Sequence, residues 1–245
     1  MRAVSIFGMG YVGACVAGCL AKDGFKVIGV EVDDKKVNML NSGVPPFKEN
    51  MIAELLTSGI KEGKIRATKD AQQALLETEA SLICVGTPSE SDGSVNLNAV
   101  KAVGATLGNT LKNKPEYHLF VMRSTVPPGT CSVLIKIMEE YSGKECGKDF
   151  GFCMNPEFLR EGTSVQDFYD PPFTIIGQFD SKSGAILEAL YSDVNVSKVF
   201  RMKLRDAEIF KYFNNAFHAL KVTFANEVGR ISDQYGCDSQ DIMEI

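Results

Sequence analysis

The chain has 245 residues, of which 44% are hydrophobic and 23% are charged, and its formal net charge is −5 at pH 7. This is the composition of an ordinary globular protein, with too much apolar material for a disordered chain. The acidic balance, without clustered basic residues, argues against a nucleic-acid partner. No segment approaches the roughly 20 apolar residues of a membrane span, so we expect no membrane partner either.

The seven cysteines are odd in number, no pair of them has zinc-ribbon spacing, and several lie inside apolar runs. We interpret them as reduced, mostly buried thiols of a cytoplasmic protein. Cys15 and Cys19 are one helical turn apart, but a metal ion would need more ligands than the surrounding sequence offers. We therefore expect these two side chains to be packed in the core and no metal to be bound.

Short apolar runs alternate with helical patterns along the chain. The runs predict strands over residues 4–7, 27–32, 81–85 and 119–122, with weaker candidates at 173–176 and 199–200. Helical spacing of apolar residues occurs between them, at residues 12–23, 99–111 and 131–140. Apolar strands that alternate with helices predict an α/β fold with a doubly wound, Rossmann-like, mostly parallel sheet.

The alternating pattern ends near residue 202, and a long helical pattern follows from about residue 204 to about residue 235. We therefore place a Rossmann-like domain at 1–202 and the start of a central helical region at 203–245. The predicted helix has apolar residues on more than one face, which exceeds what one packing surface needs. This distribution predicts a homodimer that forms through the long helix.

Gly8, Gly10 and Gly13 form a Gly-x-Gly-x-x-Gly run directly after the first predicted strand, where a helix begins. In this motif the first glycine permits a tight turn, the second admits a pyrophosphate and the third packs helix on strand. The pyrophosphate then lies at the helix N-terminus, where unpaired N–H groups favour negative charge. The alternative, a glycine-rich turn without a ligand, fits this strand–turn–helix context less well.

Glu31 ends the second predicted strand, where a carboxylate accepts hydrogen bonds from the adenosine ribose of a dinucleotide. An acid at this position repels a 2′-phosphate, so we expect NAD rather than NADP as cofactor. Lys35 and Lys36 follow closely and offer partial compensation for the extra charge of NADP. The alternative interpretation of Glu31 is an ordinary exposed acid at the end of a strand.

Thr87 and Thr125 each follow a predicted strand of the parallel sheet. Ligands of doubly wound folds bind outside the carboxyl ends of the strands, so we expect both loops to point to the cofactor crevice. Each threonine alone is equally consistent with the cap of a turn or helix. Because two occur at matching positions, we favour contacts with the ribose or the nicotinamide.

Two further groups of polar residues are candidates for a substrate site. Glu157 and Glu161 are four residues apart and share one face if the segment is helical; alone they would be a solvated charge pair. Lys211, Asn215 and His218 form a polar stripe at i, i+4 and i+7 of the long helix, with Asn226 about two turns further on. A lone lysine there is more often a surface residue, but the stripe as a set favours a binding role.

Five motifs in this order resemble the UDP-glucose/GDP-mannose dehydrogenase family. They are residues 6–13 (IFGMGYVG), 83–88 (ICVGTP), 123–130 (RSTVPPGT), 155–162 (NPEFLREG), and Lys211-Tyr212 with Asn215. The resemblance covers essentially the whole chain. Residues 15–20 (CVAGCL) and 222–227 (VTFANE) look more like the GDP-mannose branch than the UDP-glucose branch.

The resemblance implies oxidation of a nucleotide sugar at C6 to a uronic acid, with two NAD consumed and a cysteine that traps the aldehyde. GDP-mannose is the expected substrate and UDP-glucose the alternative. The residues that would face NAD are Gly8, Gly10, Tyr11, Val12, Gly13, Glu31, Lys36, Thr87 and Thr125. Those that would face the sugar are Glu161, Lys211, Asn215, His218 and Asn226. Lys211 and Asn215 would stabilise a C6 oxyanion, and Glu157, with Thr125, would order the hydrolytic water.

The chain departs from the family pattern at three places. Glu31 stands where the family usually has Asp, and residues 49–51 (ENM) replace Glu-Pro-Gly. The family's catalytic cysteine lies in a glycine-rich segment beyond the long helix, and none of the seven cysteines matches it; Cys153 is the nearest rival. We therefore expect a truncated enzyme without its C-terminal domain, inactive by itself.

Two other interpretations compete with a truncated dehydrogenase. The chain would alternatively be a naturally short, non-catalytic module that binds NAD or a nucleotide sugar. A β-hydroxyacid dehydrogenase shares the glycine motif but lacks the segment 155–162.

Overall fold

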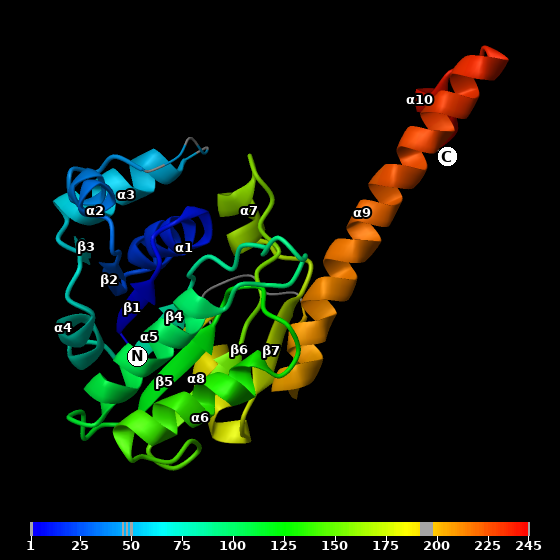
Figure 1. Ribbon diagram of the computed structural model, residues 1–245. Helices are drawn as coiled ribbons and strands as arrows, with labels where there is room; N and C mark the ends of the chain where they lie inside the picture. Colours follow the sequence, from blue (N-terminus) through cyan, green and yellow to red (C-terminus); the bar gives the residue numbers. More distant parts are fainter. Residues whose placement is uncertain (1, 46, 48, 50, 192–197, 245) are drawn as a thin grey trace. The chain divides into compact units, whose positions relative to one another are not determined.

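The computed structural model describes residues 2–45, 47, 49, 51–191 and 198–244 (Figure 1). The chain divides into two compact units, Met1–Glu208 and Ile209–Ile245. The expected division into domains at residue 202 stays a prediction. None of the helices within the described ranges combines the length and the apolar character that a membrane crossing needs.

An eight-stranded sheet forms the centre of the first unit, in the order β3-β2-β1-β4-β5-β6-β7-β8. The strands are β1 (Ala3–Phe7), β2 (Lys26–Val30), β3 (Ile65–Thr68), β4 (Ala80–Ile83), β5 (His118–Met122), β6 (Phe150–Met154), β7 (Thr174–Gln178) and β8 (Val199–Lys203). β1 to β6 run parallel; β7 is antiparallel to β6 and parallel to β8. The predicted doubly wound, mostly parallel fold is confirmed.

Helices cover both faces of this sheet (Figure 1). They are α1 (Tyr11–Lys22), α2 (Asp34–Asn41), α3 (Ile52–Lys61), α4 (Ala71–Leu76), α5 (Asn98–Leu111), α6 (Thr130–Ser142), α7 (Ser164–Tyr169) and α8 (Ser181–Leu190). α1 packs with α3 and α7, whereas α5 packs with α4 and α6. Each of the six predicted strands corresponds to an observed one, with shifted ends.

β3 and β6 were not among the predicted strands. In both cases the local sequence explains why the prediction missed the strand. β3 is only four residues long and carries Arg66, so it lacks the continuous apolar run of a central strand. β6 contains Gly151, which weakens a strand pattern. The glycine is needed there, because a Cβ at position 151 would lie 2.5 Å from the Tyr117 hydroxyl oxygen.

Small side chains let α1 pack closely in the core. Residues 13–21 of this helix are buried, and Cys15 and Cys19 are fully inaccessible to solvent. A Cβ at Gly18 would lie 3.0 Å from the Cβ of Leu55 in α3, so this glycine lets the two helices approach. The two cysteines are therefore packing residues, as expected, and no group of potential metal ligands occurs in the part of the chain that the structure describes.

The inner strands also enclose a chain of polar side chains. Ser5 Oγ lies 2.7 Å from Ser81 Oγ, which lies 2.8 Å from His118 Nε2. Thr78 donates from its hydroxyl to the carbonyl oxygen of Ala74 and lies 3.1 Å from Ser5 Oγ. Burial, with a smaller effect of nearby Lys114, lowers the pKa of His118 to about 3, so its ring is neutral.

The second unit consists of a short helix and the larger part of a long helix. α9 (Leu204–Tyr235) has 32 residues and begins and ends where the sequence predicted. α10 (Ser239–Met243) follows after a turn at Gly236, whose φ is +67°. Large apolar side chains of α9 are exposed in this unit, with 60% to 65% of their surface accessible at Phe213, Phe217, Leu220 and Phe224.

Candidate functional site

A cleft of about 630 Å³ lies in the first unit, beside β1 and β4, where the order of the strands along the sheet reverses. In open α/β sheets this switch point, at the carboxyl ends of the strands, is where ligands bind. The residues predicted to face the cofactor that line the cleft are Gly8, Gly10, Tyr11, Val12, Glu31, Lys36, Thr87 and Thr125. The sequence motifs thus converge on one cavity.

Glycine stands at the three motif positions for different structural reasons. Gly8 has φ +95°, a left-handed conformation that disfavours a side chain, and a Cβ there would lie 2.7 Å from the carbonyl oxygen of Cys84. Gly13 does not line the cleft, because it packs against the turn and a Cβ there would lie 2.0 Å from the Gly8 oxygen. Gly10 has nothing within 4 Å of such an atom, so its surroundings are open.

The N-terminus of α1 faces the cleft without a side-chain cap. Gly10 is the N-cap residue, and the first backbone hydrogen bond runs from Ala14 N to Gly10 O at 2.9 Å. The amides of Tyr11, Val12 and Gly13 therefore have no acceptor within the helix. Such amides, together with the helix dipole, favour an anion at this end of the helix.

Glu31 is only 8% exposed, so it is not an ordinary surface acid. Its Oε1 accepts from the amides of Val32 (2.8 Å) and Asp33 (3.3 Å). Its Oε2 accepts from the Met9 amide at 3.3 Å and lies 3.9 Å from Lys36 Nζ. These contacts fix the carboxylate on the wall of the cleft, where Oε2 retains the capacity to accept a further hydrogen bond.

Thr87 and Thr125 connect the two loops that form the opposite wall. The Thr87 hydroxyl donates to the carbonyl oxygen of Thr125 at 2.9 Å. Neither threonine caps a helix, since the N-cap residues of α5 and α6 are Leu97 and Gly129. With its proton directed to the other loop, the Thr87 hydroxyl remains an acceptor toward the cleft.

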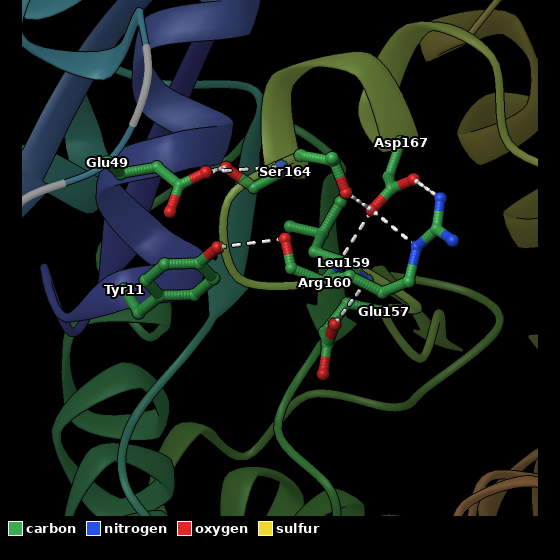
Figure 2. A network of polar contacts seen from close by, with 8 residues as sticks. Tyr11, Glu49, Glu157, Leu159, Arg160, Ser164 and Asp167 are labelled. Carbon is green, nitrogen blue, oxygen red and sulfur yellow. Dashed lines mark hydrogen bonds and ion pairs between the residues drawn. The ribbon is translucent and has the colours of Figure 1, made fainter. Parts of the chain in front are cut away.

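The segment 155–163 lies outside any helix, so Glu157 and Glu161 do not share a helical face as the sequence had allowed. Glu157 lines the cleft, and its Oε2 accepts from the Leu159 amide at 2.7 Å (Figure 2). Glu161 is exposed. The structure thus brings one of the two predicted carboxylates to the cofactor cleft.

Arg123 is a cleft residue to which the sequence analysis assigned no role. It is 6% exposed, and its Nη1 donates to Asn155 Oδ1 and, at 2.9 Å, to the Tyr191 hydroxyl. Burial opposes its charge, but Tyr191, Cys84 and Glu157 outweigh burial and raise the pKa of the guanidinium. Within the described residues its Nε is buried without a hydrogen-bond partner. In the sequence, the feature that could have identified Arg123 as a cleft residue is its position directly after the strand β5.

Two cysteines of the first unit, Cys84 and Cys153, are poor nucleophiles. Cys84 lines the cleft, but burial raises the pKa of its thiol to about 12. Cys153 lies in β6, has no accessible surface, and burial raises the pKa of its thiol as well. Both thiols are therefore protonated at neutral pH, whereas nucleophilic attack needs the thiolate.

The three residues of the predicted polar stripe, Lys211, Asn215 and His218, and also Asn226 lie on α9 in the second unit. The continuous helix gives the first three the i, i+4 and i+7 spacing that places them on one side. Asn215, His218 and Asn226 are exposed. Lys211, in contrast, is buried, so it is not the exposed surface lysine that the sequence offered as the alternative.

Comparison with known families decides the classification. A model described as the UDP-glucose/GDP-mannose dehydrogenase family, NAD binding domain, matches residues 2–195. The chain belongs to this family. The model of the family's central domain matches residues 205–245. As a member of the UDP-glucose/GDP-mannose dehydrogenase family the chain has an NAD-binding domain, which confirms the expected cofactor.

Individual relatives come from both branches of the UDP-glucose/GDP-mannose dehydrogenase family. The chain is 45% identical over 243 residues to GDP-mannose 6-dehydrogenase of Azotobacter vinelandii, which covers 99% of the chain and 56% of that protein. It is 38% identical to UDP-glucose 6-dehydrogenase AglM of Haloferax volcanii, over 98% of the chain and 57% of that protein.

A solved ternary complex of GDP-mannose dehydrogenase from Pseudomonas aeruginosa is similar to the whole chain, with a TM-score of 0.96 at 43% identity. The match covers 56% of that chain. The present chain therefore spans a little over half the length of the relatives that it matches.

Proposed function

We propose that the chain is part of an NAD-dependent enzyme that oxidises a nucleotide sugar at C6 to a nucleotide uronic acid, with GDP-mannose as substrate. The observation that carries the proposal is the single cleft in which the glycine turn, Glu31, Thr87 and Thr125 meet. The relatives named GDP-mannose 6-dehydrogenase are 43% to 45% identical over almost the whole chain, against 38% for UDP-glucose 6-dehydrogenase AglM, which favours this nucleotide sugar over UDP-glucose.

The cleft residues fit a dinucleotide in shape and charge. The uncapped amides at the start of α1 suit the pyrophosphate, and Gly8 and Gly10 leave the backbone beside them without side chains. Val12 lines the cleft, and Gly13 contributes by letting α1 pack against the turn. Glu31 suits the ribose hydroxyls, and Lys36 adds a cation near the same position. We assign Thr87 and Thr125 to the other end of the cofactor, and Tyr11 to the wall between cofactor and substrate.

The roles on the substrate side follow from the chemistry of the reaction. Bound NAD would accept the hydride in each of two oxidations. We assign Lys211 and Asn215 to the C6 oxygen, where a cation and an amide donor stabilise developing negative charge. Glu157, held in the cleft by the Leu159 amide, would position the water that releases the acid. Glu161, His218 and Asn226 complete the proposed contacts with the nucleotide sugar.

Thermal unfolding with and without ligands tests the substrate. NAD alone should raise the Tm because it binds only the folded chain. We expect GDP-mannose to raise the Tm further in the presence of NAD, and UDP-glucose to raise it less. An equal or larger shift with UDP-glucose would favour the UDP-glucose branch, and no shift with NAD would contradict the cofactor site.

The covalent step needs a thiolate, and neither Cys84 nor Cys153 is suited to supply one. Both thiols are kept protonated by burial. The purified chain should therefore not produce two NADH for each GDP-mannose consumed. A ratio of two that disappears in Cys153→Ser would make Cys153 the nucleophile, contrary to this assignment.

We also propose a homodimer that forms through α9 and a cytoplasmic location. Phe213, Phe217, Leu220 and Phe224 recur at helical spacing along α9 and expose 60% to 65% of their surface in the second unit, and a contiguous exposed apolar patch marks an interaction surface. The seven free thiols fit a reducing compartment. Sedimentation at micromolar concentration tests the dimer: Phe217→Glu should shift it to monomer, and a monomeric wild-type chain would contradict it.

A further inference from the structure

The loop between β6 and α7 is tied to the cofactor side of the cleft by two neighbouring side chains, Tyr11 and Glu49, which also interact with each other. Tyr11, the first residue of α1, donates from its hydroxyl to the carbonyl oxygen of Arg160 at 3.1 Å (Figure 2). Glu49, in the segment before α3, accepts hydrogen bonds from Gly162 and Ser164. These contacts join residues more than a hundred positions apart in the sequence.

Glu49 is a polydentate acceptor for the end of this loop. Its Oε2 accepts from the Gly162 amide at 3.0 Å, and its Oε1 accepts from the Ser164 hydroxyl at 3.0 Å and the Ser164 amide at 3.3 Å. Partial burial opposes ionisation, but these donors outweigh it and hold the pKa of Glu49 below its ordinary value. The carboxylate therefore stays charged, and charge-assisted bonds of this kind are about twice as strong as neutral ones.

Tyr11 contacts the cleft, the loop and the segment before α3 at the same time. Tyr11 is one of the residues that line the cleft, its backbone amide belongs to the uncapped N-terminus of α1, and its ring centroid lies 5.0 Å from that of Phe47. Burial raises the pKa of its hydroxyl to about 12, so it remains a donor at neutral pH.

The loop itself is braced, so that a displacement at one residue is passed to the next. Arg160 donates to Asp167 from its backbone amide at 2.9 Å and from its guanidinium at 2.6 Å and 3.2 Å. The Thr163 hydroxyl donates to the same carboxylate at 2.9 Å. Glu157, three residues before Arg160, lines the cleft. Glu157 accepts from the amide of Leu159, the residue next to Arg160, and this bond connects the Tyr11 contact to a carboxylate of the site.

We propose that Tyr11 and Glu49 are positioning residues that couple occupation of the cofactor cleft to the geometry of residues 157–164. A pyrophosphate bound to the amides at the start of α1 fixes Tyr11, and Tyr11 in turn fixes the carbonyl of Arg160. Glu49 holds the other end of the loop at Gly162 and Ser164. This inference rests on the proposed function only in taking the cleft as the NAD site.

Hydrogen–deuterium exchange of the chain, with and without saturating NAD, tests the coupling without any turnover. NAD should slow exchange of the amides of residues 160–164 in the wild type by about tenfold, the effect of one hydrogen bond. In Tyr11→Phe, which loses only the hydroxyl, we expect this protection to vanish. Because Tyr11 also lines the cleft, the Kd of each variant for NAD is measured by calorimetry first, and exchange is then compared at the same fractional saturation.

Tyr169→Phe is the matched control. The Tyr169 hydroxyl ties α7 to the other end of α1, donating to Asp23 Oδ1 at 2.9 Å or to the Cys19 carbonyl oxygen at 3.1 Å. It has no place in the cleft wall. Its removal should leave the protection by NAD unchanged.

Glu49→Gln and Glu49→Ala extend the test to the second contact. Glu49→Gln keeps one acceptor oxygen and should speed exchange at Gly162 and Ser164 by less than Glu49→Ala does. Equal protection by NAD in Tyr11→Phe and wild type, or unchanged exchange at both amides in Glu49→Ala, would overturn the coupling. Failure of the wild type to bind NAD would overturn the proposed function as well, so the two failures are distinguishable.

Discussion

A Cβ atom at position 13 would lie 2.0 Å from the carbonyl oxygen of Gly8. Position 13 therefore requires glycine, because α1 packs directly against the preceding turn. The obstacle is backbone, which cannot turn aside as a flexible side chain would. The third glycine of the motif is therefore a packing residue, whereas Gly10 borders the cleft itself.

Gly13→Ala and Gly10→Ala should separate folding from cofactor binding. Gly13→Ala should destabilise the chain by about 3 kcal/mol or more, since overpacking against backbone lies at the costly end of such changes. Gly10→Ala meets nothing within 4 Å and should leave the urea midpoint nearly unchanged while weakening NAD. Equal loss of stability in both variants, measured by urea unfolding, would contradict this division.

The chain should bind NAD more tightly than NADP, because the buried carboxylate of Glu31 repels a 2′-phosphate. Glu31→Gln keeps the shape and one acceptor oxygen but removes the charge. We expect about tenfold weaker NAD binding, as for one charge-assisted hydrogen bond, together with stronger NADP binding. Lys36→Met, which removes the cation 3.9 Å from Glu31, should sharpen the preference for NAD. Calorimetric titration that shows equal affinities in the wild type would contradict the role of Glu31.

Acidification should destabilise the chain through His118 well before the carboxylates titrate. The pKa of the buried ring is about 3 in the folded state, against about 6.5 in the unfolded chain. The unfolded state therefore takes up the proton first, and stability is complete above about pH 6.5 and falls toward pH 3. Between pH 7 and pH 5 the loss should be about 2 kcal/mol for one proton.

Urea unfolding at several pH values measures this loss. His118→Gln should flatten the pH dependence in this window whatever its absolute stability. The other histidine, His218, is exposed on α9, so His218→Gln should keep the wild-type slope. An unchanged slope in His118→Gln would refute the assignment.

Met51 should be replaceable by glycine with a gain in stability. It is the non-glycine residue with a positive φ, +64°, in the described part of the chain. The left-handed conformation costs about 1–2 kcal/mol with a side chain, against about 0.5–1 kcal/mol for the added freedom of glycine in the unfolded state. Because Met51 is 53% exposed, little packing is lost, and Met51→Gly should stabilise by about 0.5–1 kcal/mol.

Met39→Gly is the comparison for this prediction. Met39 lies within α2 and is 38% exposed, so glycine there should destabilise by about 1 kcal/mol. The two variants should thus shift the thermal midpoint in opposite directions. A loss of stability in Met51→Gly would mean that the backbone at this position carries no strain.

Much of the cofactor cleft was predictable because its signals are local. The glycine motif lies within six residues, and the tight turn, the helix start and the preceding strand all restrict backbone geometry over that short distance. The ends of α9 were predictable for the same reason, since a helix is set by periodicity along the chain. Parallel topology then brought Glu31, Thr87 and Thr125 to the same edge of the sheet.

The sequence alone thus determined the fold class, the family motifs and the cofactor wall, because these depend on contacts between near neighbours and on strand order. Only the tertiary structure decided that residues 155–163 form a loop rather than a helix, and that Glu49 and Tyr11 hold it. The same applies to Arg123, buried between Asn155 and Tyr191, and to the reversal of β7. These features depend on hydrogen bonds between residues far apart in the chain, which leave no periodic trace in the sequence and form only once packing has removed water around them.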